Sequence, residues 1–518
     1  MLEVVAYDIG RVCKDKNNNE TPSLISFDFD DYIAMPYDCE DIYEKFEKSF
    51  IFEKDNIKYQ ILNYGKYLEK AEIKKADIYV LIDSRILIQR KELIHIKEIR
   101  QKISPNSAIL FPSVYPWEIP LLVYLGVDYF TDLSDYLASL GYRLTKNRAI
   151  KSDLDFEELR EINKKVYEDI LLEVREAIKN GYLRNVVEET SISHPYLWAN
   201  YKRYKPDLRF IPLSKENKVI VTANINVPEV EKYLERLEFY EPFSNVVVLL
   251  PCSAKKPYST SKSHRIFKEY LKGFTVEEVV LTSPYGLVPR ALERVVNYDI
   301  PVTGEWSYEE KELINRLLKS FIENVKKKFG DCIVIAHLPK HYYEILEIDC
   351  IKTGDNPLSK ESLNNLRKIL NEYKDITKNK SKKEQIIHNI KELAKFQFEI
   401  DFIPDDIKIN RKEQIFYNNR QIASINQKNG LLVLTYYGGE LLWNKGFKDS
   451  YYIEVSYDIK KGTLFPPGFV DCNDSISYKD EVIFIKEDEY LGVGRALMPG
   501  IEMKKAEHGG LAIIRKVK

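Results

Sequence analysis

Short apolar runs, separated by segments long enough for helices, recur along the first third of the chain. Five of these runs are predicted as strands: Val4 to Tyr7, Ser23 to Phe27, Ile78 to Ile82, Ala108 to Phe111 and Val127 to Phe130. The alternation predicts βα units with a parallel sheet, in either a barrel or a doubly wound arrangement. A long helix is predicted from about Phe156 to Asn180, where apolar residues recur at helical spacing and Gly181 follows in the place of a C-cap glycine.

A second series of apolar runs begins near residue 240. The predicted strands are Val246 to Leu250, Val276 to Thr282, Cys332 to Ala336 and Ile348 to Lys352. Ser307 and Glu310 have the spacing of a capping box at the start of a helix, and a further helix is predicted after Ser359. This series predicts a doubly wound α/β domain with an essentially parallel sheet.

Towards the C-terminus the pattern becomes one of short strands. Residues 374–383 are rich in lysine and are predicted as a linker or a solvated helix end. The alternating run at 430–436 predicts a small α+β module. From about residue 451, short alternating strands with glycine turns predict a small β-barrel.

Composition narrows the class of protein. The chain has 518 residues, of which 44% are hydrophobic, enough for the cores of three or four domains. A net charge of −2 argues against wholesale coating by nucleic acid but allows a local basic patch. No stretch approaches a membrane span, and six scattered cysteines without a Cys-x-x-Cys pair predict neither a disulfide framework nor a zinc site. We therefore expect a cytoplasmic protein that needs no metal or other cofactor and contacts no membrane.

The candidate chemistry lies in the loop after the strand at 246–250. Cys252 follows Pro251 at the carboxyl end of that strand, the edge at which open α/β sheets bind ligands. Between Pro251 and Lys272 there are six Lys or Arg residues against one acid, Glu269, and positive charge favours the thiolate form of a nearby thiol. A lone cysteine is more often a small buried hydrophobe, but this basic setting favours a nucleophile.

Polar groups also follow the other predicted strands. They lie in the segments 283–290, 298–306, 337–341 and 353–355, and the four strand ends would form one crevice with Cys252 at its floor. Each group has a simpler interpretation: His264 as a helix cap, His337 and His341 as loop histidines, Tyr258 and Tyr285 as packing residues, Asp299 and Glu305 as solvated carboxylates.

The same segments resemble the archaeosine synthase family. The match consists of Pro251-Cys252, Lys256-Pro257-Tyr258, Ser261 and His264, followed by the segments 283–290 and 298–306. The resemblance implies an enzyme that acts on archaeal tRNA carrying 7-cyano-7-deazaguanine in the D-loop and converts its nitrile to an amidine, giving archaeosine or a lysine-bearing precursor. It implies Cys252, Lys256, Tyr258, Ser261 and His264 as catalytic residues, and Lys255, Ser283, Tyr285, Arg290 and Asp299 as substrate-binding residues.

The residues fit this chemistry. A thiolate is the best protein nucleophile for a nitrile, and attack by Cys252 would give a thioimidate. An amine from free lysine, glutamine or ammonia would then displace the sulfur. Lys256, Tyr258 and His264 are all candidates by type for the acid that the nitrile nitrogen needs.

Two further resemblances concern the flanking regions. Gly10-Arg11, the segment 122–130 that contains Asp128, and the segment 178–188 resemble the barrel domain of tRNA-guanine transglycosylases, although no Asp-Ser-Gly segment and no cysteine cluster for zinc accompany them. The segments 461–470, 491–498 and 507–512 resemble a PUA domain, which implies binding of structured RNA.

The predicted architecture is α/β and multidomain. It comprises a degenerate barrel-like domain at 1–205, the α/β catalytic domain at 206–378, a small α+β module at 379–448, similar to the second C-terminal domain of archaeal transglycosylases, and a PUA β-barrel at 449–518. Expected partners are tRNA, the amine donor, a radical enzyme that processes a lysine adduct, and a second copy of the chain in a homodimer. The alternatives are a base-exchanging transglycosylase and a non-catalytic tRNA-binding protein.

Overall fold

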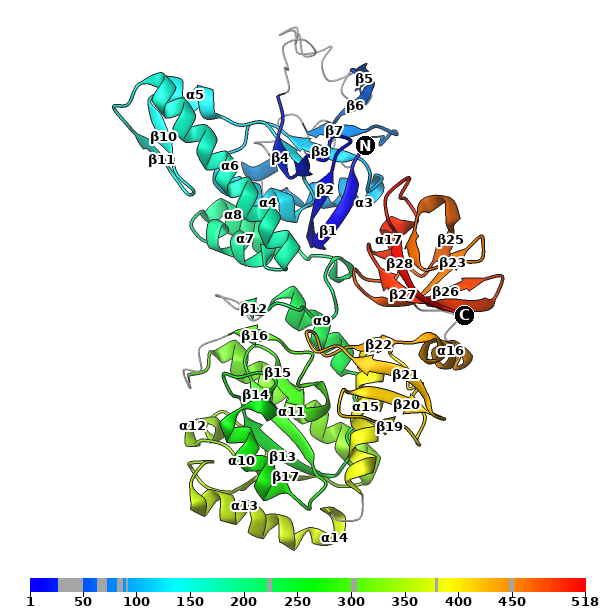
Figure 1. Cartoon of the computed structure of the whole chain (residues 1–518). Helices are drawn as coiled ribbons and strands as arrows, with labels where there is room; N and C mark the ends of the chain where they lie inside the picture. Colours follow the sequence, from blue (N-terminus) through cyan, green and yellow to red (C-terminus); the bar gives the residue numbers. More distant parts are fainter. Residues whose placement is uncertain are drawn as a thin grey trace. The chain divides into compact units, whose positions relative to one another are not determined.

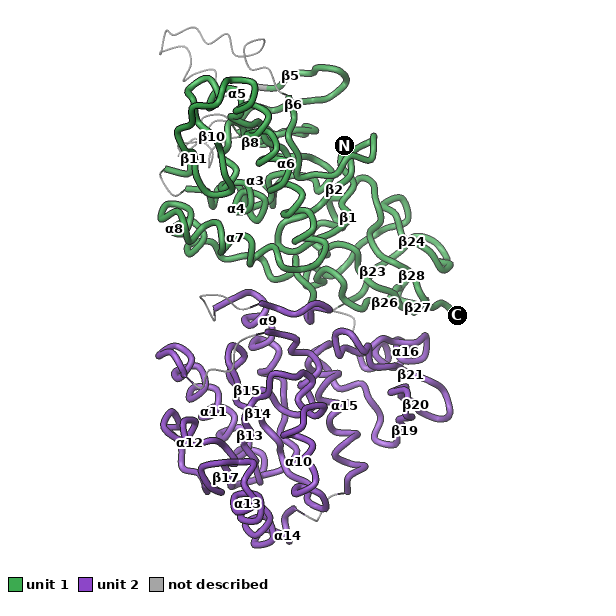
Figure 2. The backbone as a smooth tube through the Cα atoms, turned by 60° about the vertical axis from the view of Figure 1, so that its left-hand side comes forward, with its two compact units in different colours: residues 1–212, 449–517 green, residues 213–448, 518 purple. Residues whose placement is uncertain are grey.

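The computed structural model of the protein describes residues 1–26, 50–62, 72–81, 87–89, 92–220, 226–299, 305–377, 381–446 and 451–518. The chain divides into two compact units, one formed by residues 1–212 and 449–517 and the other by residues 213–448 and 518 (Figure 2). Within the described part of the chain, no helix is both long and apolar enough to cross a membrane.

The first unit contains a mainly parallel sheet that curls into a half-barrel (Figure 1). Its order is β4 (Ser23–Leu24), β9 (Tyr129–Phe130), β8 (Ala108–Phe111), β7 (Ile78–Leu81), β6 (Ile57–Leu62) and β5 (Phe50–Lys54). All neighbours are parallel except β5 and β6, which form a hairpin. The predicted strands at 78, 108 and 127 are confirmed within one or two residues, whereas Phe27 and Ile82 lie outside the described residues.

One predicted strand has a different role. Val4 to Tyr7 lies in β1 (Glu3–Asp8), which pairs antiparallel with β2 (Gly10–Lys14), and β2 pairs with β3 (Glu20–Thr21). The prediction that this run belongs to the parallel sheet is therefore wrong. The reason is a tight reversal at Ile9, whose φ of 64° turns the chain straight back.

A buried ion pair joins this hairpin to the half-barrel. Arg11 donates to both carboxylate oxygens of Asp128 at 2.9 Å, and its remaining donors bind the carbonyls of Pro105 and Ser107. Gly10 is needed beside it, because a Cβ atom there would lie 2.7 Å from the carbonyl oxygen of Val123. Gly10, Arg11 and Asp128, which carry the transglycosylase resemblance, thus stabilise the fold. Removing one partner of a buried ion pair lowers the free energy of unfolding by about 3–5 kcal/mol.

Helices cover the half-barrel and extend from it (Figure 1). They are α3 (Ile94–Lys102), α4 (Ile119–Tyr124), α5 (Ser134–Ser139), α6 (Phe156–Asn180), α7 (Leu183–Ser191) and α8 (Pro195–Arg203), with the hairpin β10 (Tyr142–Leu144) and β11 (Ala149–Lys151) between α5 and α6. The predicted bounds of α6 are confirmed. Asp155 caps its first turn by accepting a hydrogen bond from the Glu158 N–H at 2.9 Å, and Gly181 ends it at a φ of 79°.

The C-terminal part of this unit is a small β structure. Its six strands have the order β24 (Gly462–Leu464), β28 (Ala512–Val517), β27 (Glu489–Ala496), β26 (Glu481–Lys486), β23 (Tyr452–Val455) and β25 (Phe469–Cys472), with α17 (Gly500–Met503) between β27 and β28. Tyr7 of β1 belongs to the core of this barrel and hydrogen-bonds Glu502. The Asn106 side chain also accepts a hydrogen bond from the Glu507 N–H at 2.7 Å.

The second unit is built on a five-stranded sheet. Its order is β15 (Gly286–Pro289), β14 (Glu277–Thr282), β13 (Val246–Pro251), β17 (Ile333–Ala336) and β18 (Ile351–Lys352). β14, β13, β17 and β18 are parallel, as predicted, and β13 is buried along its whole length. The segment after β14 was predicted as a loop and instead returns as antiparallel β15, because Gly286 permits the reversal at a φ of 69°.

Helices flank this sheet, and a small module follows it (Figure 1). The helices are α9 (Pro228–Leu237), α10 (Lys262–Leu271), α11 (Tyr308–Phe329), α12 (Lys340–Tyr343), α13 (Lys360–Glu372), α14 (Lys374–Thr377) and α15 (Lys382–Phe398). The short strands β12 (Val219–Ile220) and β16 (Tyr298–Asp299) pair with each other. The module consists of β19 (Lys408–Ile409), β20 (Gln414–Tyr417), β21 (Arg420–Ile425), β22 (Leu432–Leu434) and α16 (Tyr436–Asn444). The predicted capping box of Ser307 and Glu310 is present at the start of α11.

Candidate active site

Cys252 lies at the carboxyl end of β13, one residue past the buried strand. Its side chain is half-buried, and its Sγ atom is 3.4 Å from the hydroxyl oxygen of Tyr342 on α12. α12 follows β17, the neighbouring parallel strand, so two strand ends meet at the thiol. The predicted position of the thiol, at the carboxyl end of a parallel strand, agrees with the structure. Open α/β sheets bind their ligands at this edge.

A chain of hydroxyl groups lies next to the cysteine loop. Tyr258 is fully buried and shares a hydrogen bond of 2.8 Å with the Tyr298 hydroxyl, which also hydrogen-bonds Thr282 at the end of β14. Burial raises the pKa of Tyr298, and the charge of Cys252 adds to this. Tyr258 therefore positions the wall of the site through Tyr298 and has its own hydroxyl already engaged.

The Lys256 ammonium interacts electrostatically with Cys252 and lies over the ring of Tyr298. Its Nζ atom sits 3.8 Å from the centre of the Tyr298 ring. Burial lowers the pKa of Lys256, while the charges of Cys252 and Asp299 oppose that shift. The face of the Tyr298 ring supports the positive charge of this half-buried ammonium.

His264 is buried beneath the cysteine loop. Its Nε2 atom is 2.9 Å from the Pro251 carbonyl oxygen and its Nδ1 atom is 3.0 Å from a guanidinium nitrogen of Arg290. Burial first, and then the charge of Arg290, lower the pKa of His264 to about 4, so the ring is neutral near pH 7. A neutral ring that accepts from Arg290 at Nδ1 donates from Nε2 to the carbonyl of Pro251. The ring thus fixes the residue that precedes Cys252.

Arg290 has protein partners on three sides. Besides His264, it binds Glu278 at 2.8 Å and Glu293 at 2.8 Å, and these carboxylates raise the pKa of Arg290 against the effect of burial. The Glu293 carboxylate in turn accepts a hydrogen bond of 2.8 Å from the Ser259 N–H. These contacts connect Arg290 to the cysteine loop, and its predicted role in substrate binding stays a prediction.

Of the remaining predicted site residues, three are held in contacts within the protein and two are exposed to solvent. Ser261 caps α10 by accepting from the His264 N–H at 3.3 Å, and Ser283 donates to Glu310. Tyr285 is buried, with its ring centre 5.2 Å from that of Tyr298. Lys255 and Asp299 are exposed, and Asp299 pairs with Lys218 at 3.2 Å. Their roles in catalysis and substrate binding stay predictions.

Sequence reasoning missed Tyr342, which lies directly after the predicted loop 337–341. Its ring packs edge-on against Trp306, with ring centres 5.0 Å apart. A Tyr-Tyr pair just beyond the carboxyl end of a parallel strand was the available signal. Cys332 and Cys350 were predicted inside strands, but each stands one residue before its strand.

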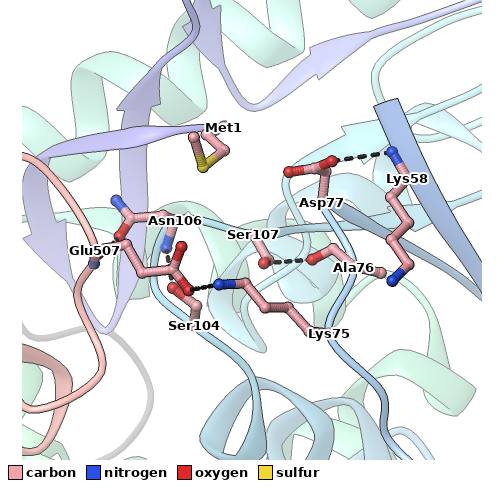
Figure 3. Close-up of a pocket in the computed structure, with 9 residues that line it drawn as sticks. All are labelled: Met1, Lys58, Lys75, Ala76, Asp77, Ser104, Asn106, Ser107 and Glu507. Carbon is pink, nitrogen blue, oxygen red and sulfur yellow. Dashed lines mark hydrogen bonds and ion pairs between the residues drawn. The ribbon is translucent and has the colours of Figure 1, made fainter. Parts of the chain in front are cut away.

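A cavity of about 230 Å³ lies elsewhere, in the first unit (Figure 3). It is lined by Met1, Lys58, Lys75, Ala76, Asp77, Ser104, Asn106, Ser107 and Glu507. The Lys75 ammonium pairs with the Glu507 carboxylate at 2.7 Å. One of the positive charges that line the cavity is therefore already neutralised. The cavity shares no residue with the cysteine site. Among the described residues, no group of three or more His, Cys, Asp or Glu side chains is placed to hold a metal ion.

Two family models match the chain, one in each unit. Residues 230–370, which include Cys252 and Tyr342, match the family described as Domain of unknown function (DUF5591). Residues 454–518 match the PUA domain, which confirms the predicted C-terminal barrel.

Related proteins extend the comparison to the whole chain. The archaeosine synthase of Methanocaldococcus jannaschii is 60% identical over 100% of both chains. The archaeosine synthase subunit alpha of Thermococcus kodakarensis is 30% identical over 85% of this chain and 80% of its own. The tRNA-guanine(15) transglycosylase of Methanocaldococcus jannaschii is 23% identical over 77% of this chain and 64% of its own. By its identity to the first of these over its full length, the chain belongs to the archaeosine synthase family.

Proposed function

We propose that the protein is a tRNA-modifying transferase that converts the nitrile of 7-cyano-7-deazaguanine in tRNA to the amidine of archaeosine or of its lysine-bearing precursor. Membership of the archaeosine synthase family supports a role in archaeosine synthesis on tRNA. The PUA domain supports RNA binding, because domains of this type contact structured RNA through local surface patches.

The observation that carries the proposal is the position of Cys252. The thiol is half-buried at the ligand-binding edge of a parallel sheet, beside the Lys256 ammonium and the Tyr342 hydroxyl. A thiolate in such a place can reach a bound base, and its charge is supported by the cation.

The reaction divides into two additions to one carbon. The Cys252 thiolate adds to the nitrile carbon, one of the carbon–nitrogen π bonds becomes a lone pair on nitrogen, and a proton converts that nitrogen to the N–H of a thioimidate. An amine then adds to the same carbon, loses a proton, and expels the thiolate to leave the amidine. No oxidant or reductant is consumed.

The amine can be free lysine or ammonia, and glutamine can serve as the donor once water hydrolyses its amide to glutamate and ammonia; lysine and ammonia each balance this second addition. With lysine the product retains the whole amino acid. A further enzyme would then have to cleave an unactivated carbon–nitrogen bond, a step that calls for radical chemistry.

The test is conversion of tRNA bearing 7-cyano-7-deazaguanine, followed by mass spectrometry of the nucleosides with each amine donor in turn. Cys252→Ala should abolish conversion while tRNA affinity stays within about twofold, because the thiol acts in the chemistry and not in positioning. Cys332→Ala is the matched control and should retain activity. Conversion by Cys252→Ala would refute the thioimidate route, and release of the free base would instead favour base exchange.

A further inference from the structure

The hydroxyl group of Tyr342 contacts the thiol of Cys252. The residue is 3% exposed and belongs to the short helix α12 at the end of β17. Its hydroxyl oxygen lies 3.4 Å from the Cys252 Sγ atom, and the edge-on Trp306 ring holds the phenol from the side. The hydroxyl is therefore fixed at the atom that becomes bonded to substrate.

Two of the candidate acids, Tyr258 and His264, are engaged elsewhere, and the third, Lys256, has its ammonium over the Tyr298 ring. The Tyr258 hydroxyl is hydrogen-bonded to Tyr298, and both ring nitrogens of His264 contact protein groups. The neutral His264 ring has its proton on the nitrogen that faces the Pro251 carbonyl, so that proton is held in a hydrogen bond to the backbone. Geometry thus separates Tyr342 from Tyr258 and His264, and among the contacts given it is the Tyr342 hydroxyl that touches Sγ.

We propose that Tyr342 is the acid that protonates the nitrile nitrogen when Cys252 adds to the nitrile carbon, an inference that rests on the proposed function. In the thioimidate this nitrogen is two bonds from Sγ, so a nitrile bound with its nitrogen towards α12 brings that atom within hydrogen-bond distance of the Tyr342 hydroxyl. The O–H bond of Tyr342 breaks as the new N–H bond forms, and the negative charge passes from the nitrogen to the phenolate.

The proton balance closes in the second addition. The incoming amine carries a surplus proton once it has bonded to carbon, and the Tyr342 phenolate takes it up. Burial raises the pKa of Tyr342, and the charge of Cys252 raises it further, so the resting phenol is protonated throughout the neutral range. The same high basicity makes the phenolate a strong acceptor for the amine's proton.

The experiment compares Tyr342→Phe with Tyr343→Phe, the same change on the next residue. The Tyr343 hydroxyl donates to the Gly354 carbonyl at 2.7 Å and thus controls for loss of a hydroxyl from α12. In single turnovers on nitrile-bearing tRNA, intact-protein mass spectrometry should show the Cys252 adduct forming about 100-fold more slowly in Tyr342→Phe. Tyr343→Phe should form it within about threefold of the wild-type rate, and iodoacetamide should still alkylate Cys252 in both.

Several results would overturn the assignment. Adduct formation by Tyr342→Phe at a near wild-type rate would remove Tyr342 as the acid while leaving Cys252 as the nucleophile, whereas activity in Cys252→Ala would remove the proposed function itself. If Tyr342→Phe does not fold, 3-fluorotyrosine at position 342 supplies an isosteric, more acidic phenol. Adduct formation should then become faster at the same pH, because a more acidic phenol is a better proton donor, and an unchanged rate would contradict the proposal.

Discussion

Replacing Arg290 by Met removes one cation from a site that holds two carboxylates and an imidazole. The guanidinium lies 2.8 Å from Glu278, 2.8 Å from Glu293 and 3.0 Å from the Nδ1 atom of His264. The three charged side chains are 17%, 16% and 9% exposed for Arg290, Glu278 and Glu293. Arg290→Met therefore leaves two carboxylates facing each other with little access to water.

The size of the effect follows from this burial. Removing one partner of a buried ion pair costs about 3–5 kcal/mol, and the partial exposure of these groups places the loss near the lower end, about 3 kcal/mol. For a unit of the size of residues 213–448, each kcal/mol corresponds to about 2–4 °C, so the expected fall in Tm is about 6–12 °C.

Differential scanning calorimetry of the full chain measures this loss in the second unit, with tRNA affinity measured alongside. Adding Glu278→Gln to Arg290→Met should restore part of the lost Tm, because it removes one of the uncompensated charges. The opposite pattern, an unchanged Tm together with weaker tRNA binding, would refute the structural role and return Arg290 to the substrate-binding residues.

Two further changes test the frame of the cysteine loop. Lys256→Ala should slow the alkylation of Cys252 at neutral pH by about fivefold in the absence of tRNA. The reason is the loss of a positive charge that stabilises the thiolate by about 1 kcal/mol. The same dependence of alkylation rate on pH in both proteins would assign Lys256 to RNA contact. His264 has a lowered pKa of about 4 in the fold, so its contribution to stability is complete above about pH 6.5 and is lost as the pH falls towards 4, by about 3 kcal/mol. His264→Gln should remove this part of the acid destabilisation in urea unfolding measured against pH, and an unaltered pH dependence would contradict the buried neutral ring.

Much of the fold follows from local signals in the sequence. The ends of α6 and α11 could be predicted because caps mark them: Asp155 and Gly181 for the first helix, Ser307 with Glu310 for the second. β13 could be predicted because an uninterrupted apolar run indicates a strand buried on both faces. The partner of a strand is set by contacts far along the chain, so periodicity could not show that β1 forms a separate hairpin or that β15 returns antiparallel.

The candidate site divides in the same way. Cys252 could be placed from the sequence, because its position follows from the end of one strand. Tyr342 could not be assigned to it, because their contact joins residues ninety positions apart. Ser261 illustrates a motif with two meanings: its spacing to His264 belongs to the family signature, and the same spacing makes it the N-cap of α10.

The insertion of Tyr7 into the C-terminal barrel has a consequence for the order of folding during synthesis. The first unit is discontinuous in sequence, since residues 1–212 and 449–517 form it together, and the core around Tyr7 contains residues as late as Ile514. A ribosome therefore releases residues 213–448 before the barrel residues that pack around Tyr7 exist. Because domains fold as units as they emerge, residues 213–448 can complete their core first, while β1 waits with an unmatched apolar face until the last strand is made.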